Sequence, residues 1–121
     1  MSEPFTLTAG EGRGRAAVLR VRGRLDARSS PEMMRRCQEA RAALPAGRRH
    51  LVLNLADVTF LSSAGVGVLL ALAEGTREDG GSLRLAPVSA PARSVLDVLN
   101  LQHFLTIDAS EDAAIEALKA A

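Results

Sequence analysis

The sequence predicts a small α/β protein, and three observations support that prediction. Residues 51–55 are almost continuously apolar, which is typical of a strand buried in a parallel sheet. At residues 62–63 the apolar spacing changes to the period of a helix face. Two segments near the N-terminus, residues 5–9 and 17–22, have the composition of strands. We expect a small mixed β-sheet, antiparallel at its N-terminal edge and otherwise mainly parallel, packed with about four helices.

The N-terminal segments are predicted to pair as an antiparallel hairpin. Residues 5–9 alternate apolar and polar side chains, and the glycine-rich residues 10–14 form a turn before the second strand. A linker over residues 23–30 follows and ends in the chemistry of a helix start. Ser29 offers a capping hydroxyl, a proline follows in the first turn, and Glu32 lies three residues after the serine.

The remaining elements alternate between helices and strands. The first helix is stopped by residues 45–47, and its arginines are expected to face water. Its inward side chains are predicted to be Met33, Cys37, Ala40 and Leu44. The central strand reaches the second helix through a short link, residues 56–61. The second helix ends over residues 74–78, and a strand over 82–88 follows it. Next come a third helix with Val95, Leu96 and Leu99 on one face, a strand over 105–108, and a terminal helix capped by Ser110.

Composition restricts the class of protein. A chain of 121 residues suits one domain, residues 1–121, with one core. The net charge of +1 and the absence of Tyr and Trp argue against a nucleic-acid partner. No secretory signal is visible, and the longest apolar run, residues 65–73, is too short to cross a bilayer. We therefore expect a cytoplasmic protein with no membrane partner.

The sequence offers no catalytic site, metal site or cofactor site. His50 and His103 have no second ligand at helical spacing, and the single cysteine, Cys37, is interpreted as a buried small side chain rather than a reactive thiol. Ser63 lies at a strand-to-helix turn, but S-S-A-G is not the G-x-S-x-G of a nucleophile elbow. No phosphate-binding glycine motif follows the strand. We expect a protein that is not an enzyme.

The start of the second helix has two features that call for an explanation. Gly65 and Gly67 each weaken a helix, so either the helix packs tightly on the sheet there or a partner protein approaches its backbone. One of Ser62 and Ser63 is expected to cap the helix, which leaves the other exposed at its positive end. A phosphate there would meet backbone N–H groups, yet it would disrupt a close-packed protein interface.

Residues 53–70, LNLADVTFLSSAGVGVLL, resemble the signature of the STAS family, the domain shared by bacterial anti-sigma factor antagonists and sulphate transporters. Three further segments fit the same family in the expected order along the chain. Residues 23–26 (GRLD), 81–85 (GSLRL) and 95–101 (VLDVLNL) are similar to its G-x-L-D, G-G-x-L-x-L and third-helix segments. The resemblance implies a STAS-like fold over nearly the whole chain.

The resemblance also implies a function. In antagonists of this family the motif D-S-[ST/A]-G carries a serine that a combined anti-sigma factor and serine kinase phosphorylates and a serine phosphatase restores. On this sequence the phosphorylated residue falls on Ser63, or less favourably on Ser62, which occupies the aspartate position. Asp26 matches a loop aspartate and is either a partner contact or a cap of the first helix. The expected partner-binding residues are Asp26, Ser62, Ser63, Ala64, Gly65, Val66 and Gly67.

The leading hypothesis is therefore a switch. The unphosphorylated monomer or weak dimer binds the anti-sigma factor, and phosphorylation of Ser63 releases it. Two alternatives stay open at this point. The chain could be a STAS scaffold or sensor subunit of a signalling complex without a sigma factor, or an accessory that binds a small ligand or lipid.

Overall fold

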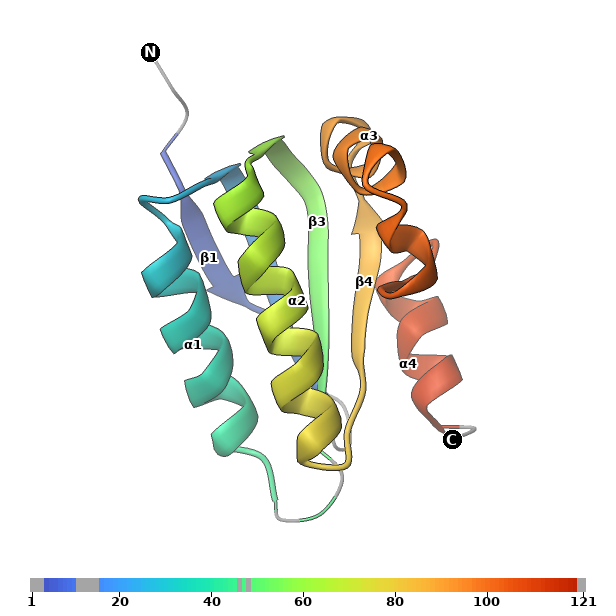
Figure 1. The fold of residues 1–121 in the computed structure, drawn as a ribbon. Coiled ribbons are helices and arrows are strands. Elements are labelled where there is room, and N and C mark those ends of the chain that lie inside the picture. The colour runs from blue at the N-terminus through green and yellow to red at the C-terminus, as the bar shows by residue number, and fades with distance from the viewer. Residues whose placement is uncertain (1–3, 11–15, 46, 48, 120–121) are drawn as a thin grey trace.

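The computed structural model describes residues 4–10, 16–45, 47 and 49–119 (Figure 1). Nothing is described for residues 11–15, which include most of the predicted glycine turn, or for Ala46 in the predicted helix stop. The elements are β1 (Thr6–Ala9), β2 (Ala16–Leu25), α1 (Ser30–Ala42), β3 (His50–Leu61), α2 (Ser63–Glu78), β4 (Leu83–Val88), α3 (Ala90–Val98), a 3-10 turn η1 (Leu101–His103), β5 (Thr106–Ile107) and α4 (Glu111–Lys119).

The strands form one five-stranded mixed sheet in the order β1-β2-β3-β4-β5. β1 pairs antiparallel with β2, and the other three pairings are parallel. The first half of the central strand β3, residues 50–55, is mostly apolar because helices cover both of its faces. These observations confirm the predicted α/β class, the antiparallel N-terminal edge and the order of the elements.

Helices cover the sheet on both faces. Side chains of α1, α2 and α3 share the larger core with one face of β2, β3 and β4. α4 packs on the other face through a second core cluster that consists of Ala16, Val18, Val52, Ala86, Ala114, Ile115 and Leu118. In Figure 1, α1 and α2 lie side by side across the near face of the sheet, with α3 at the end of β3 and β4.

β2 and β3 are longer than the sequence predicted. The predicted link, residues 56–61, is the second half of β3, and residues 23–25 of the predicted linker belong to β2. The pairing of the two strands shifts register between Arg20 and Arg22 and again between Gly23 and Arg24. A bulge turns two successive residues outward, as at Ala56 and Asp57, so the alternation that marks a strand is lost while the pairing continues.

Two helices differ from the prediction in the residues that they bury. α1 buries Met33 and Cys37 as expected, but Arg41, predicted to face water, is only 12% exposed because it bridges to α2. α3 buries Ala92 and Leu96, whereas Leu99 is half exposed. Because α3 lies over the end of the sheet, only one narrow stripe of it reaches the core.

Candidate phosphorylation and binding site at the start of α2

The structure brings the loop after β2 and the start of α2 together. β2 and β3 end side by side, with Leu25 paired to Leu61. The backbone N–H of Ser62 then donates to the carbonyl oxygen of Leu25 at 3.0 Å. Asp26 follows directly in the chain, so the G-x-L-D and S-S-A-G segments form one surface at the carboxyl end of the parallel strands. Ligand sites of α/β proteins commonly occur at this end.

The two adjacent serines have different roles. Ser62 is the N-cap of α2: its backbone is extended, and its hydroxyl oxygen accepts a hydrogen bond from the N–H of Gly65 at 3.3 Å. Ser63 is the first residue of the helix and its side chain is exposed. The spare serine that the sequence analysis expected beside the cap is therefore Ser63.

The dipole of α2 favours an anion on Ser63. α2 runs from Ser63 to Glu78 and has no acidic residue in its first turn. The partial positive charge of the helix N-terminus is therefore not offset within that turn. A phosphate on the Ser63 hydroxyl would lie at this positive end, where phosphates bind well.

Gly65 and Gly67 of α2 have different surroundings. A Cβ on Gly65 would collide with the carbonyl oxygen of Leu25 and come within 2.8 Å of a methyl group of Leu61, so this glycine lets α2 rest on the end of β2. A Cβ on Gly67 would meet nothing within 4 Å, and the residue is exposed. Tight packing therefore accounts for Gly65 and leaves Gly67 without a structural reason.

The other expected site residues lie at different depths. Ala64 and Ser62 are partly exposed, whereas Gly65 and Val66 are buried beneath the helix start. The buried pair shapes the surface from below. Its accessible part consists of Ser62, Ser63, Ala64, Gly67 and the Asp26 loop.

Asp26 organises the loop that enters α1. Its carboxylate accepts hydrogen bonds from the backbone N–H groups of Arg28 at 3.0 Å and Ser29 at 3.3 Å. Removal from water raises the pKa of the Asp26 carboxyl, but these N–H donors and the Arg24 guanidinium, 3.5 Å away, together lower it below its ordinary value. Asp26 is therefore ionised at neutral pH and half-buried next to the start of α2.

The predicted capping box of α1 is not formed. Ser29 is the N-cap residue, but its side chain makes no capping bond and donates back to the carbonyl oxygen of Arg24 at 2.8 Å. The Ser29 hydroxyl oxygen accepts from the backbone N–H of Asp26 at 3.0 Å, and the Asp26 carboxylate accepts from the N–H groups of Arg28 and Ser29, so the two residues hold the loop together. Because this leaves the Asp26 carboxylate partly exposed, a role as loop cap does not prevent a role in binding.

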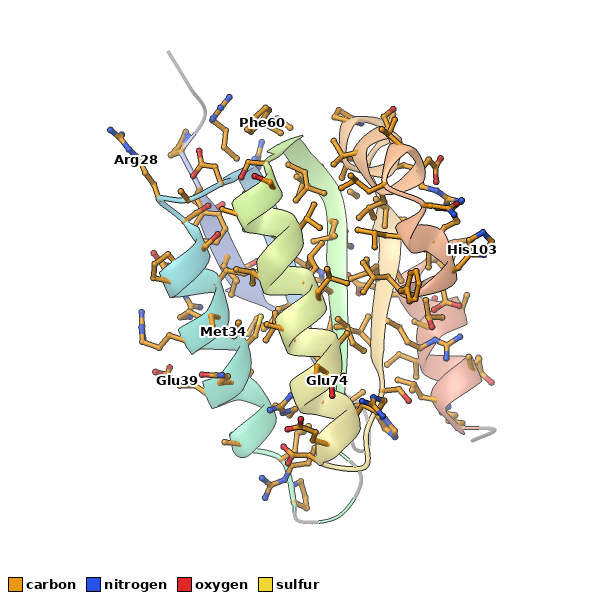
Figure 2. All side chains as sticks on the ribbon, in the orientation of Figure 1. Arg28, Met34, Glu39, Phe60, Glu74 and His103 are labelled. Carbon is orange, nitrogen blue, oxygen red and sulfur yellow. The ribbon has the colours of Figure 1, made fainter. Side chains whose placement is uncertain are left out.

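Sequence reasoning missed a cation–π pair beside this surface. The guanidinium of Arg24 lies 4.0 Å from the centre of the Phe60 ring, which is 39% exposed. Figure 2 shows Phe60 and Arg28 at the end of the molecule where α2 begins. Only the register across the β2 bulge brings Arg24 opposite Phe60, so no short-range sequence pattern could have indicated the pair.

Neither histidine lies in a metal site in the part of the chain that is described. No group of three His, Cys, Asp or Glu side chains there could hold a metal ion. His50 is buried at the start of β3, where its Nδ1 accepts from the N–H of Ser82 at 3.0 Å. His103 is exposed on η1. Among the described helices, none is both long and apolar enough to span a membrane.

Comparison with known proteins assigns this α/β fold, with its paired G-x-L-D and S-S-A-G segments, to a family. The model of the STAS domain matches residues 9–114, and the chain belongs to the STAS domain family. An anti-sigma F factor antagonist of Paenibacillus polymyxa is 29% identical over 84% of this chain and 86% of that protein. BtrV of Bordetella bronchiseptica is 31% identical over 69% of this chain and 72% of that protein.

Solved structures share the fold. An anti-sigma factor antagonist from Mycobacterium paratuberculosis superposes with a TM-score of 0.79 at 23% identity, covering 98% of this chain and 99% of that one. Unphosphorylated SpoIIAA superposes with a TM-score of 0.78 at 22% identity, covering 96% and 98%. Anti-sigma factor antagonists are non-enzymatic regulatory proteins, which agrees with the expectation that this chain is not an enzyme.

Proposed function

We propose that this protein is a cytoplasmic anti-sigma factor antagonist that works as a phosphorylation-controlled switch. The unphosphorylated form binds an anti-sigma factor that is also a serine kinase, through Ser63, the exposed start of α2 and the Asp26 loop. Phosphorylation of Ser63 releases the partner, and a serine phosphatase restores binding. The observation that carries the proposal is the division of roles between Ser62, which caps α2, and Ser63, which is exposed beside it.

The physical argument has two parts. A phosphate on Ser63 adds a charge of about −1.5 to −2 at the positive end of a helix, so the fold tolerates it. The same charge in a closely packed interface must be desolvated, which opposes binding. The relatives named as antagonists and the related SpoIIAA fold, solved in a phosphorylated form, support the assignment.

The test uses an anti-sigma serine kinase of the same organism, with intact mass and pull-down as readouts. We expect one added phosphate on the wild type and on Ser62→Ala, no phosphate on Ser63→Ala, and release from the kinase after modification. Ser63→Ala should keep binding and Ser63→Asp should lose it. Equal binding by these two variants would contradict the switch.

Stability measurements separate the two serines further. Ser62→Ala removes the hydroxyl that accepts from Gly65, so it should lower the free energy of unfolding by about 1 kcal/mol. Ser63→Ala should change it by less than about 0.5 kcal/mol because the side chain is exposed. Binding to the kinase without phosphate transfer would indicate a scaffold in place of a switch.

A further inference from the structure

An apolar groove lies beside the candidate phosphorylation site. Ser63 of α2 forms one wall, and Ser94, Val95, Val98 and Leu99 of α3 and its C-cap form the rest. Val98 is 84% exposed and Leu99 is 50% exposed. Among the large apolar side chains of the described residues, only Phe104, at 74%, is also more exposed than Leu99, and it lines a different groove with Leu70.

The exposed side chains of Val98 and Leu99 are not what holds α3 on the domain. α3 is held by Ala92 and Leu96, which are fully buried, and by Ser89 at its start. The Ser89 hydroxyl donates to the carbonyl oxygen of Val58 at 2.7 Å and accepts from the N–H of Ala92 at 3.3 Å. Val98 therefore contributes little to the core, and only contact with another molecule could remove it from water.

We propose that this groove is the apolar half of the surface that binds the serine kinase, an inference that rests on the proposed function. A kinase must bring its phosphate donor to the Ser63 hydroxyl. Because Ser63 is itself a wall of the groove, a protein that closes over Ser63 also covers Val98 and Leu99. The partner should present exposed aliphatic or aromatic side chains at this position.

The size of the groove argues against self-association through it alone. Its cavity volume is about 320 Å³, and Val95, Val98 and Leu99 are its only apolar side chains. A stable interface buries about 1,200–2,000 Å² in total, so the groove needs an adjoining contact surface. On the α2 side, that adjoining surface is the one that contains Ser63.

The groove and Ser63 then have different roles in binding. Burial of Val98 and Leu99 supplies affinity that does not depend on phosphorylation. A phosphate on Ser63 lies at the rim of the same groove, where its charge would have to lose water for the apolar surfaces to meet. The phosphorylated residue that controls binding therefore lies next to the apolar side chains that supply the affinity.

The experiment measures binding to the kinase that phosphorylates the chain, loaded with ADP so that no transfer occurs. Val98→Gln and Leu99→Gln should each weaken binding about tenfold. Phe104→Gln is the matched control, since it removes a similarly exposed apolar side chain outside the groove. Circular dichroism and thermal unfolding should be unchanged in all three variants.

A second measurement does not depend on weakened binding. Cys37 is fully buried, so Val98→Cys offers one accessible thiol for an environment-sensitive dye. The dye should shift to the blue when the kinase is added, and the same dye on Phe104→Cys should not. Wild-type affinity in both glutamine variants, or no shift at Val98→Cys, would overturn the inference.

The two proposals fail in different ways. If Ser63→Asp abolishes binding while Val98→Gln and Leu99→Gln bind normally, the switch stands and the groove assignment is wrong. If Val98→Gln instead dissociates a dimer of the wild type in sedimentation without affecting the kinase, the groove belongs to a second copy. A chain that binds no serine kinase overturns both proposals.

Discussion

Gly65 and Gly67 are separated by one residue, yet their environments predict opposite effects of the same substitution. Gly65→Ala would drive a Cβ into the carbonyl oxygen of Leu25, part of a backbone that cannot move aside, and should destabilise the protein by about 1–3 kcal/mol. Gly67→Ala places its methyl group in open space on a helix and should stabilise it by about 0.5–1 kcal/mol. Urea unfolding of the two variants checks both signs.

Gly67 also tests how close the partner comes. If the kinase approaches the backbone of α2 as proposed, the added methyl group of Gly67→Ala should weaken binding although the free protein is more stable. If Gly67→Ala is more stable but binds the kinase with unchanged affinity, the partner leaves this position uncovered. Loss of stability in Gly67→Ala would contradict the open surroundings of this residue.

At the scale of the elements, one side chain ties α1 to α2. Arg41 donates to the hydroxyl oxygen of Thr76 at 2.6 Å and pairs with Asp79 at 3.3 Å, and only 12% of its side chain is exposed. Arg41→Ala removes both contacts and should lower the free energy of unfolding by about 1–2 kcal/mol. The measurement is chemical denaturation at neutral pH.

The matched control for Arg41→Ala is Arg35→Ala on the same helix. Arg35 pairs with Glu39 at 3.1 Å, but its side chain is 60% exposed and the pair is well screened. Its removal should cost less than about 0.5 kcal/mol. Equal losses for the two variants would mean that the α1–α2 bridge adds nothing beyond surface charge.

The elements also show what the sequence could and could not predict. The apolar period located α2, and the two serines at its start were correctly expected to divide into a cap and an exposed hydroxyl. The full length of β3 was missed because the bulge beside Asp57 interrupts the alternation on which strand prediction depends. The water-facing position given to Arg41 was wrong because its partners come from another helix, 35 residues away.

Neighbours that lie far apart in the sequence explain the remaining misses. Arg24 meets Phe60 only through strand register, and Ser63 and Val98 line one groove although they belong to different helices, α2 and α3. Neither pairing has a local sequence signal. The motif therefore located the serine of the candidate site, whereas the surface around that serine required the fold.

For the molecule as a whole, the buried thiol of Cys37 should make the stability of the fold depend on pH in the alkaline range. Cys37 is fully buried, and this burial raises the pKa of its thiol from 9.0 to about 12, against a smaller lowering by Arg36 and Arg41. The chain has no tyrosine, and Lys119 is its only lysine. Few other groups therefore titrate between about pH 9 and 11.

The sign of the effect follows from the raised pKa. Below about pH 9 the thiol is protonated in both the folded and the unfolded state, so its contribution to stability is fully present. As the pH rises from 9.0 toward about 12, only the unfolded state ionises, and stability should fall by up to about 1.4 kcal/mol per pH unit. Urea unfolding at about pH 8 and about pH 10 measures this loss.

Cys37→Ala provides the control because it removes the titrating group and leaves the surrounding core apolar. Its stability should be lower at neutral pH, owing to the smaller side chain, but nearly independent of pH over the same range. The wild-type thiol should also react with a thiol reagent only after unfolding. A flat profile in the wild type, or rapid labelling of the folded protein, would show that the packing around Cys37 admits water, and the assignment of one continuous core under α1 and α2 would then be wrong.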